Sequence, residues 1–167
     1  LAQAPDFLEK DSIIGYVLRG KPDANEAEAK KILTKLGIND FDKDINTLSG
    51  GQKKRIALAK TLVSPAEVLI LDEPTNHLDS DMVEWLEQYI KKFKGELLMV
   101  THDRYFLDNV TNRIVEIDKG SLYSYETNYS GFLEMKTERE DMLRATEAKR
   151  ANTLRRELEW IRRGCQA

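Results

Sequence analysis

Two acidic side chains follow directly on an unbroken apolar run near the middle of the sequence. Residues 68–71 read VLIL, and Asp72 and Glu73 come next. A run of this kind is typical of a parallel strand covered on both faces, and open α/β sheets bind ligands beyond the carboxyl ends of their strands. Because adjacent carboxylates in such a place need a compensating cation, we expect Asp72 to hold Mg²⁺ and Glu73 to orient or deprotonate a water.

A serine and two glycines precede these acids in the sequence, at Ser49, Gly50 and Gly51. Ser49 can cap a helix, and the glycines allow the backbone to approach a phosphate closely. The free N–H groups and the positive end of the helix dipole then form an anion site. The apolar spacing predicts that this helix continues until Pro65 ends it. Taken alone, the glycine pair is better interpreted as a turn, and the two acids as a solvated strand end, whereas both together at this spacing favour a functional site.

A second apolar run, residues 97–100, predicts a parallel strand that follows a helix over residues 81–93. It would deliver Thr101, His102 and Asp103 to the same sheet edge as the two acids. Taken alone, a histidine in this position is best interpreted as a structural residue. The sequence therefore places several polar groups at one edge of an α/β sheet.

The remaining sequence predicts further elements on both sides of this centre. Residues 11–36 form two expected helices with a break at residues 20–22, and residues 103–110 form a short one. Residues 114–117 and 122–125 are expected to form a hairpin that closes the sheet. From residue 128 to 163 the chain has no Pro and is rich in Glu, Arg, Lys and Ala, which predicts a helix of about 36 residues, or roughly 54 Å.

Composition and charge narrow the classes of protein. The 167 residues are 41% apolar and 33% charged, with a single cysteine, Cys165. No apolar run reaches the length of roughly 18 residues that a membrane span requires, and no secretion leader is recognisable, so we expect a cytoplasmic protein.

The formal net charge of −3 is unevenly distributed along the chain. Residues 144–163 contain seven basic and three acidic side chains, a net charge of +4, so the other residues carry −7. A basic end on an acidic body suggests that this end meets a polyanion. Ala151, Leu154, Leu158 and Ile161 also form a narrow apolar seam suited to one partner helix, although a solvated helix with internal ion pairs is the alternative.

One stretch resembles a phosphate-binding loop only in its spacing. Residues 15–22, GYVLRGKP, match GxxxxGK[ST] except that Pro22 replaces the hydroxyl residue. The bulky residues between the glycines are patterned as a helix and could not wrap a phosphate. The sequence thus predicts no phosphate-binding loop within residues 1–167.

The central motifs together resemble the second half of an ABC-type ATPase domain. LSGGQ (residues 48–52) is similar to the signature motif, VLILDE to the Walker B strand, and NHLD (residues 76–79) to the D-loop. The resemblance implies that His102 is the switch histidine, and that Gln3 is the glutamine of the Q-loop, which reaches Mg²⁺ or the attacking water.

Four further stretches resemble the ABC-F family, and its Uup-type branch in particular. They are TNHLD from residue 75, THDRYFLD from residue 101, YSYETNYSGFL from residue 123 and ELEWIRRG from residue 157. The resemblance implies a partial P-loop NTPase core over residues 1–127, with a helical subdomain at about 9–47. Residues 128–167 would be the first half of a charged linker helix between two ABC domains.

By this resemblance, the parent protein hydrolyses ATP with Mg²⁺ and acts on the ribosome without a membrane domain. Glu73 and His102 would be catalytic, and Asp72 and Gln3 would contact the metal. Nucleotide contacts would come from the following residues: Gln3, Ser49, Gly50, Gly51, Gln52 and Asp79. Among these, the signature residues Ser49, Gly50 and Gly51 would serve nucleotide held by the second ABC domain, and the linker helix would contact rRNA or tRNA.

Residues 1–167 on their own, without a phosphate-binding loop, are expected not to hydrolyse ATP and to self-associate through an exposed sheet edge. Two other classes stay open. A transporter ATPase subunit would share the signature and Walker B motifs, and a nucleic-acid-binding module without catalysis would share the charged helix.

Overall fold

The computed structural model describes residues 12–22, 24–63 and 66–164, and it divides the chain into two compact units. The first unit is Leu1–Val110 and the second is Thr111–Ala167. Each unit is described by itself below.

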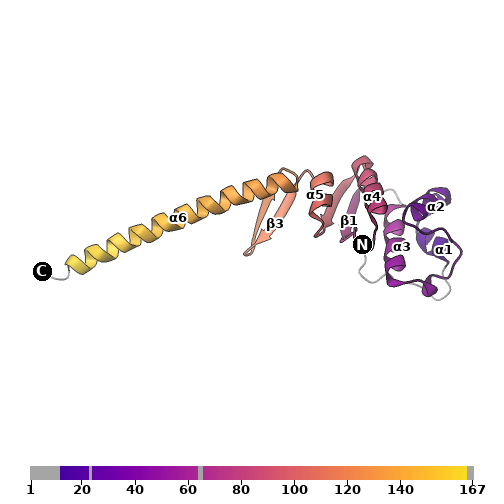
Figure 1. The fold of residues 1–167 in the computed structure, drawn as a ribbon, viewed down its shortest axis with the longest axis horizontal. Coiled ribbons are helices and arrows are strands. Elements are labelled where there is room, and N and C mark those ends of the chain that lie inside the picture. Colours follow the sequence, from indigo (N-terminus) through magenta and orange to yellow (C-terminus); the bar gives the residue numbers. More distant parts are fainter. Residues whose placement is uncertain (1–11, 23, 64–65, 165–167) are drawn as a thin grey trace. The chain divides into compact units, whose positions relative to one another are not determined.

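Helices at the beginning of the first unit form one cluster (Figure 1). They are α1 (Ile13–Leu18), α2 (Glu26–Lys35), the short 3₁₀ helix η1 (Ile45–Thr47) and α3 (Gly50–Leu62). Polar side chains cap their first turns, with Ser12 accepting a hydrogen bond from an N–H of α1 and Asn25 accepting one from α2. Their apolar faces meet in a core that includes Val17, Leu33 and Ile56, all fully buried. The two predicted helices between residues 11 and 36 are confirmed.

The rest of the first unit contains two parallel strands and two helices. The strands are β1 (Val68–Asp72) and β2 (Glu96–Val100), and the helices are α4 (Ser80–Lys92) and α5 (Arg104–Val110). The strands pair in register, with Val68 opposite Glu96 and Asp72 opposite Val100. Parallel strands joined through a helix are the expected α/β connection, so the predicted fold class is confirmed at this level.

One expectation for β1 is wrong, because the structure covers only one face of the strand. Leu69 and Leu71 are buried, whereas Val68 and Ile70 are each 56% exposed. On β2, Leu98 is exposed in the same way. Successive side chains of a strand point to opposite faces of the sheet. A strand that is covered on both faces needs an unbroken apolar run, but such a run does not by itself show that other elements pack on both faces.

The second unit is a β-hairpin followed by one long helix. It contains β3 (Ile114–Asp118), β4 (Ser121–Tyr125) and α6 (Tyr129–Gly164). The strands pair antiparallel, and Lys119 and Gly120 turn the chain with positive φ angles of 49° and 79°. The predicted helix from residue 128 to 163 is confirmed within one residue at each end.

The sequence had suggested that the hairpin closes the parallel sheet, but the strand pairing differs from this expectation. Among the described residues, β3 and β4 form a two-stranded sheet separate from that of β1 and β2. Tyr125 and Phe132 instead pack edge to face at 5.0 Å, so the hairpin buries its inner face against the first turns of α6. The sequence analysis placed the end of the ABC domain at residue 127 and the start of the linker helix at residue 128, and this domain boundary stays a prediction.

Candidate active site

Glu73 and His102 lie together at the carboxyl ends of the two parallel strands. Glu73 follows β1, and its N–H donates to the carbonyl of Val100, the last residue of β2, at 2.8 Å. Its carboxylate then reaches the chain beyond β2: Oε2 accepts from the backbone N–H of His102 at 3.4 Å, and Oε1 lies 3.7 Å from His102 Nε2. The in-register pairing of Asp72 with Val100 is what brings these side chains to one place. Their catalytic roles stay predictions.

The backbone at Glu73 adopts a conformation that side chains seldom take. Its φ angle is +46°, in the left-handed region. Strained backbone of this kind in a non-glycine residue clusters at functional sites and persists when surrounding contacts hold it. The contacts to Val100 and to residues 101 and 102 supply that support here.

Thr101 also belongs to this group, although the sequence alone assigned it no role. Its hydroxyl Oγ1 lies 3.2 Å from Glu73 Oε2 and accepts a hydrogen bond from the Asp103 N–H at 3.1 Å. A threonine next to the histidine was visible in the sequence. Only the strand register reveals that its hydroxyl reaches a carboxylate on the neighbouring strand.

Asp72, the last residue of β1, is half-buried beside this edge. Within the described part of the chain, no group of three or more His, Cys, Asp and Glu side chains is arranged to hold a metal ion. Mg²⁺ commonly binds through one or two carboxylates, with water and substrate phosphates supplying the other oxygens. A single strand-end carboxylate fits that mode of binding, and Asp72 is the residue that would hold the ion.

The side chains of Ser49 and Gln52 form reciprocal hydrogen bonds to each other's backbone N–H groups at the start of α3. The Ser49 hydroxyl accepts from the Gln52 N–H at 3.3 Å, and Gln52 Oε1 accepts from the Ser49 N–H at 3.0 Å. This reciprocal capping box fixes the first turn of the helix. The predicted nucleotide contact of Gln52 therefore competes with a local structural one. At Gly50 an added Cβ would meet no atom within 4 Å, so this turn is open to a ligand on that side.

The turn that contains Gly51 contacts the D-loop-like segment. A Cβ at Gly51 would lie 3.5 Å from the Cβ of His77, and Lys54 Nζ lies 3.1 Å from His77 Nε2. His77 has a φ angle of +69°, so its backbone is again left-handed. The turn after β1 is thus linked to α3, which the spacing of the motifs did not predict.

The remaining predicted site residues are Asp79 and Gln3. Asp79 caps α4, because its Oδ1 accepts a hydrogen bond from the Met82 N–H at 3.0 Å. Gln3 lies outside the described residues. The proposed nucleotide contacts of both residues stay predictions.

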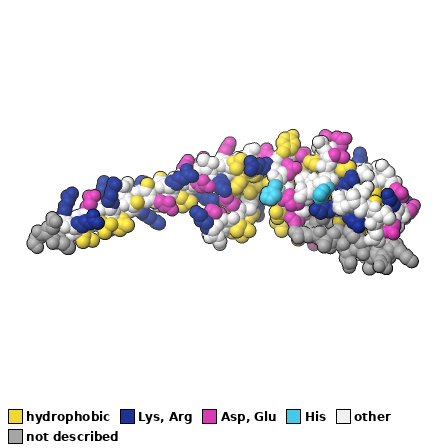
Figure 2. Space-filling view, turned by 60° about the horizontal axis from the view of Figure 1, so that its bottom comes forward, with side chains coloured by type: hydrophobic (Ala, Val, Ile, Leu, Met, Phe, Trp, Pro, Cys, Tyr) yellow, Lys and Arg dark blue, Asp and Glu magenta, His cyan; other side chains and the backbone are white. Residues whose placement is uncertain are grey.

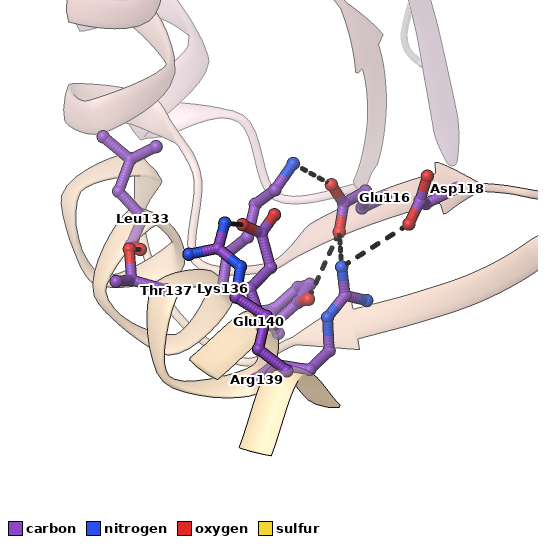
Figure 3. Close-up of polar contacts among 9 residues, drawn as sticks. Glu116, Asp118, Leu133, Lys136, Thr137, Arg139 and Glu140 are labelled. Carbon is purple, nitrogen blue, oxygen red and sulfur yellow. Dashed lines mark hydrogen bonds and ion pairs between the residues drawn. The ribbon is translucent and has the colours of Figure 1, made fainter. Parts of the chain in front are cut away.

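In the second unit, a charged cluster joins the hairpin to the beginning of α6 (Figure 3). Glu116 of β3 pairs with Lys136 and, at 2.9 Å, with Arg139 Nη2, and its Oε2 also accepts from the Tyr125 hydroxyl at 3.3 Å. Burial raises the pKa of Glu116, but the bond and charge of Lys136 together with Arg139 outweigh that effect, so the pKa lies below its ordinary value. The Glu116 side chain is only 12% exposed, which makes these contacts a specific anchor for the helix.

The rest of α6 exposes both basic and apolar side chains to solvent (Figure 2). Leu154, Leu158 and Ile161 of the predicted seam are about half exposed, at 57%, 48% and 51%. The basic residues between 144 and 163 share this exposed stretch. The helix therefore presents a charged surface with an apolar row and no cover from the described residues.

Comparison with known proteins assigns the family. Two family models, both described as ABC transporter, match residues 2–76 and 115–167. The chain is 56% identical over 154 residues to the "Uncharacterized ABC transporter ATP-binding protein YfmR" of Bacillus subtilis (strain 168), an alignment that covers 89% of this chain and 24% of that protein. The chain belongs to the ABC ATPase family. Residues 48–52 are accordingly its signature motif, and Glu73 follows its Walker B strand.

Other relatives carry the name of a translational throttle protein. The chain is 46% identical to the "Energy-dependent translational throttle protein EttA" of Mycobacterium tuberculosis (strain ATCC 25618 / H37Rv), covering 85% of this chain and 25% of the relative. The same identity is found with EttA of Escherichia coli (strain K12), covering 77% and 23%. The predicted resemblance of this ABC ATPase sequence to the ABC-F branch is confirmed.

Solved structures agree with this assignment of the fold. The "RNase-L Inhibitor" superposes with a TM-score of 0.52 and 28% identity, covering 72% of this chain and 25% of that one. A chain in the complex of archaeal ribosomal stalk protein aP1 and archaeal ribosome recycling factor aABCE1 superposes with a TM-score of 0.51, at the same identity and coverage. The ABC ATPase chain described here thus spans about a quarter of the length of the relatives it matches.

Among the helices in the described part of the chain, none is both long and apolar enough to cross a membrane.

Proposed function

We propose that these residues are part of a cytoplasmic ABC-F protein that hydrolyses ATP and acts on the ribosome. The observation that carries the proposal is the group at the strand ends, where the Glu73 carboxylate lies beside His102 one residue beyond the Walker B strand. The names of the EttA relatives and of the ribosomal stalk complex support the ribosomal part of the proposal.

In this proposal, Glu73 acts on the attacking water. Its carboxylate is 26% exposed, so a water can reach it, and its contacts on residues 101 and 102 keep it at the end of the sheet. A positioned carboxylate can orient that water or accept its proton. Mg²⁺, held by Asp72, would neutralise charge on the phosphates.

His102 would contact the terminal phosphate of ATP. Its side chain is fully exposed, so it can turn toward a ligand without breaking internal packing. An imidazole that donates to a phosphate oxygen stabilises the negative charge there and loses its partner when the phosphate leaves. His102 would in this way sense hydrolysis as well as assist it.

The signature turn would serve the nucleotide held by a second ABC domain of the same protein. Ser49 to Gly51 begin a helix whose first N–H groups have no acceptor within the helix, and the surface at Gly50 is open. The nucleotide would then require two domains to complete its site. Residues 1–167 alone, in this proposal, do not hydrolyse ATP.

We expect Glu73→Gln in the full-length protein to reduce ATP turnover by roughly 100-fold or more while ATP binding is retained, because the amide keeps the shape of the carboxylate and loses its basicity. Turnover is measured as phosphate release, and trapping as the fraction of bound ATP. Glu84→Gln, an exposed substitution in α4, is the matched control. Normal turnover in Glu73→Gln would overturn the proposed role of Glu73, and a full-length protein that releases no phosphate from ATP would overturn the proposed activity.

The exposed basic stretch of α6 would contact ribosomal RNA or tRNA. Each lysine or arginine that neutralises a phosphate releases counterions, so RNA affinity should fall as salt rises. Replacing Arg155 and Arg156 with glutamine should reduce the salt slope by about 2, whereas Lys31→Gln in α2 should leave it unchanged. An RNA affinity that does not depend on salt would contradict this role of the helix.

A further inference from the structure

We infer that Thr101 is a positioning residue for Glu73, holding one oxygen of its carboxylate so that the other faces the attacking water. This inference rests on the proposed ATP hydrolysis. It concerns a residue outside the signature, Walker B and switch positions, and it comes from the hydrogen bonds at the strand ends.

The direction of the hydrogen bond between the two side chains follows from their chemistry. A carboxylate has no proton to donate, so Thr101 must donate its single hydroxyl proton to Glu73 Oε2. The hydroxyl oxygen is in turn held by the N–H of Asp103, which donates to it at 3.1 Å. Thr101 Oγ1 thus accepts a hydrogen bond from Asp103 and donates its proton to Glu73.

The hydroxyl is tied to a fixed part of the fold. Asp103 directly precedes α5 and caps it, because its Oδ1 accepts from the Phe106 N–H at 3.0 Å and its carbonyl accepts from the Leu107 N–H at 3.0 Å. The Phe106 side chain is fully buried. The contact therefore connects the Glu73 carboxylate to the anchored start of a helix.

The second contact of the same carboxylate oxygen is weaker. The His102 N–H lies 3.4 Å from Glu73 Oε2, near the limit for a hydrogen bond. The His102 ring is fully exposed and approaches only the other oxygen, Oε1, at 3.7 Å. Thr101, which is half-buried, thus provides the shorter of the two contacts to Oε2, and Oε1 is the oxygen that we assign to the water.

Positioning matters at this residue because its backbone is strained. Glu73 has a φ angle of +46°, and its side chain is long enough to adopt several rotamers. Without the hydroxyl, the carboxylate would keep its charge but spend less time in the orientation that faces the water. We therefore expect an effect on the chemical step rather than on ATP binding.

The test compares Thr101→Val and Thr101→Ser in the full-length protein. Valine keeps the shape and removes the donor, so kcat for ATP should fall about 10-fold, while KM stays within about twofold. Serine restores the donor and should keep most of the activity. Thr34→Val, which removes an exposed hydroxyl bonded within α2, is the matched control and should match the unmodified protein.

A double substitution separates positioning from a general structural effect. When Glu73→Gln has already removed the carboxylate, adding Thr101→Val should lower the residual turnover no further, because the two residues act through one contact. If Thr101→Val is poorly folded, as judged by its thermal unfolding, Thr101→Ala and Thr101→Ser are compared at equal ATP-binding capacity.

The outcomes distinguish this inference from the proposed function. If the full-length protein does not hydrolyse ATP, the proposed function fails, and if it does but Glu73→Gln is fully active, the proposed role of Glu73 fails. If Glu73→Gln is inactive and Thr101→Val has an unchanged kcat, only the positioning role fails. A rise in KM with unchanged kcat, or a serine variant as impaired as the valine variant, would also overturn the role.

Discussion

The guanidinium carbon of Arg139 lies 3.7 Å from the centre of the Tyr123 ring. The same guanidinium pairs with Glu116 across the hairpin, so one side chain of α6 contacts both strands. Its exposed fraction is only 19%, and a desolvated cation over an aromatic face is favourable by about 1 to 2 kcal/mol. The orientation of α6 relative to the hairpin is therefore set by specific contacts in its first turns. We propose that the hairpin and the base of the helix move as one piece.

Glu116→Gln should loosen this junction. The substitution leaves Lys136 and Arg139 partly buried without their shared anion, and we expect a loss of about 1 to 2 kcal/mol in local stability. Hydrogen exchange of the amides of residues 129–139 should accelerate by roughly tenfold or more. Glu138→Gln, an exposed neutral substitution on the same helix, is the control. Unchanged exchange in Glu116→Gln would show that aromatic packing alone holds the base of α6.

The same cluster should give the junction a dependence on pH at both extremes. The pKa of Glu116 is lowered below its ordinary 4.5, so its contribution to stability is present above that value and is lost as pH falls through the lower folded-state pKa. The pKa of Lys136 is raised above 10.5, chiefly by its bond to Glu116, so its contribution is present below that value and is lost as pH rises through the folded-state pKa. Exchange of the same amides, measured in acid and in alkali, should show both losses, and Glu116→Gln should flatten both.

Local signals in the sequence predicted most elements of the fold. Helix α6 follows from a run of helix-forming residues without proline, and α3 follows from the Ser49 cap before an apolar period. These features act within a few residues of one another, so they can be read without tertiary structure. Cover of β1 could not be predicted in that way. The exposure of Val68 and Ile70 depends on which other elements pack there, and their apolar character is the same in either case.

Some features of the candidate site could likewise be predicted from the sequence, and others could not. The carboxylate and imidazole at the strand ends were predictable, because parallel strands bring their carboxyl ends to one edge. The contacts of Thr101 with Glu73 and of Lys54 with His77 were not, since each joins residues far apart in sequence. The capping roles of Gln52 and Asp79 illustrate the converse. Both were assigned to nucleotide by resemblance, although each also stands at a helix start that its side chain can cap.

Gly37→Ala should destabilise the first unit more than Gly20→Ala does. Both glycines have positive φ angles, +72° and +75°, so alanine costs each about 1 kcal/mol of backbone strain. Only at Gly37 would the new Cβ meet other side chains, 2.5 Å from Met82 Cε and 2.8 Å from Arg55 Nη1, whose hydrogen bond to the Leu36 carbonyl would then be disturbed. We expect a total loss of about 2 kcal/mol for Gly37→Ala in chemical denaturation, with Gly20→Ala as the control for strain. Equal losses would mean that the Met82 and Arg55 side chains adjust freely.

Asp79 allows its structural role and its proposed nucleotide role to be separated. Its Oδ1 caps α4 by accepting from the Met82 N–H, and asparagine can make the same bond, whereas alanine cannot. Asp79→Ala should therefore lower stability by about 1 kcal/mol, and Asp79→Asn should leave it nearly unchanged in chemical denaturation. If Asp79 also acts on nucleotide through its charge, Asp79→Asn should reduce ATP turnover in the full-length protein without that loss of stability. Turnover that declines only in Asp79→Ala, in step with stability, would assign the residue to the helix cap alone.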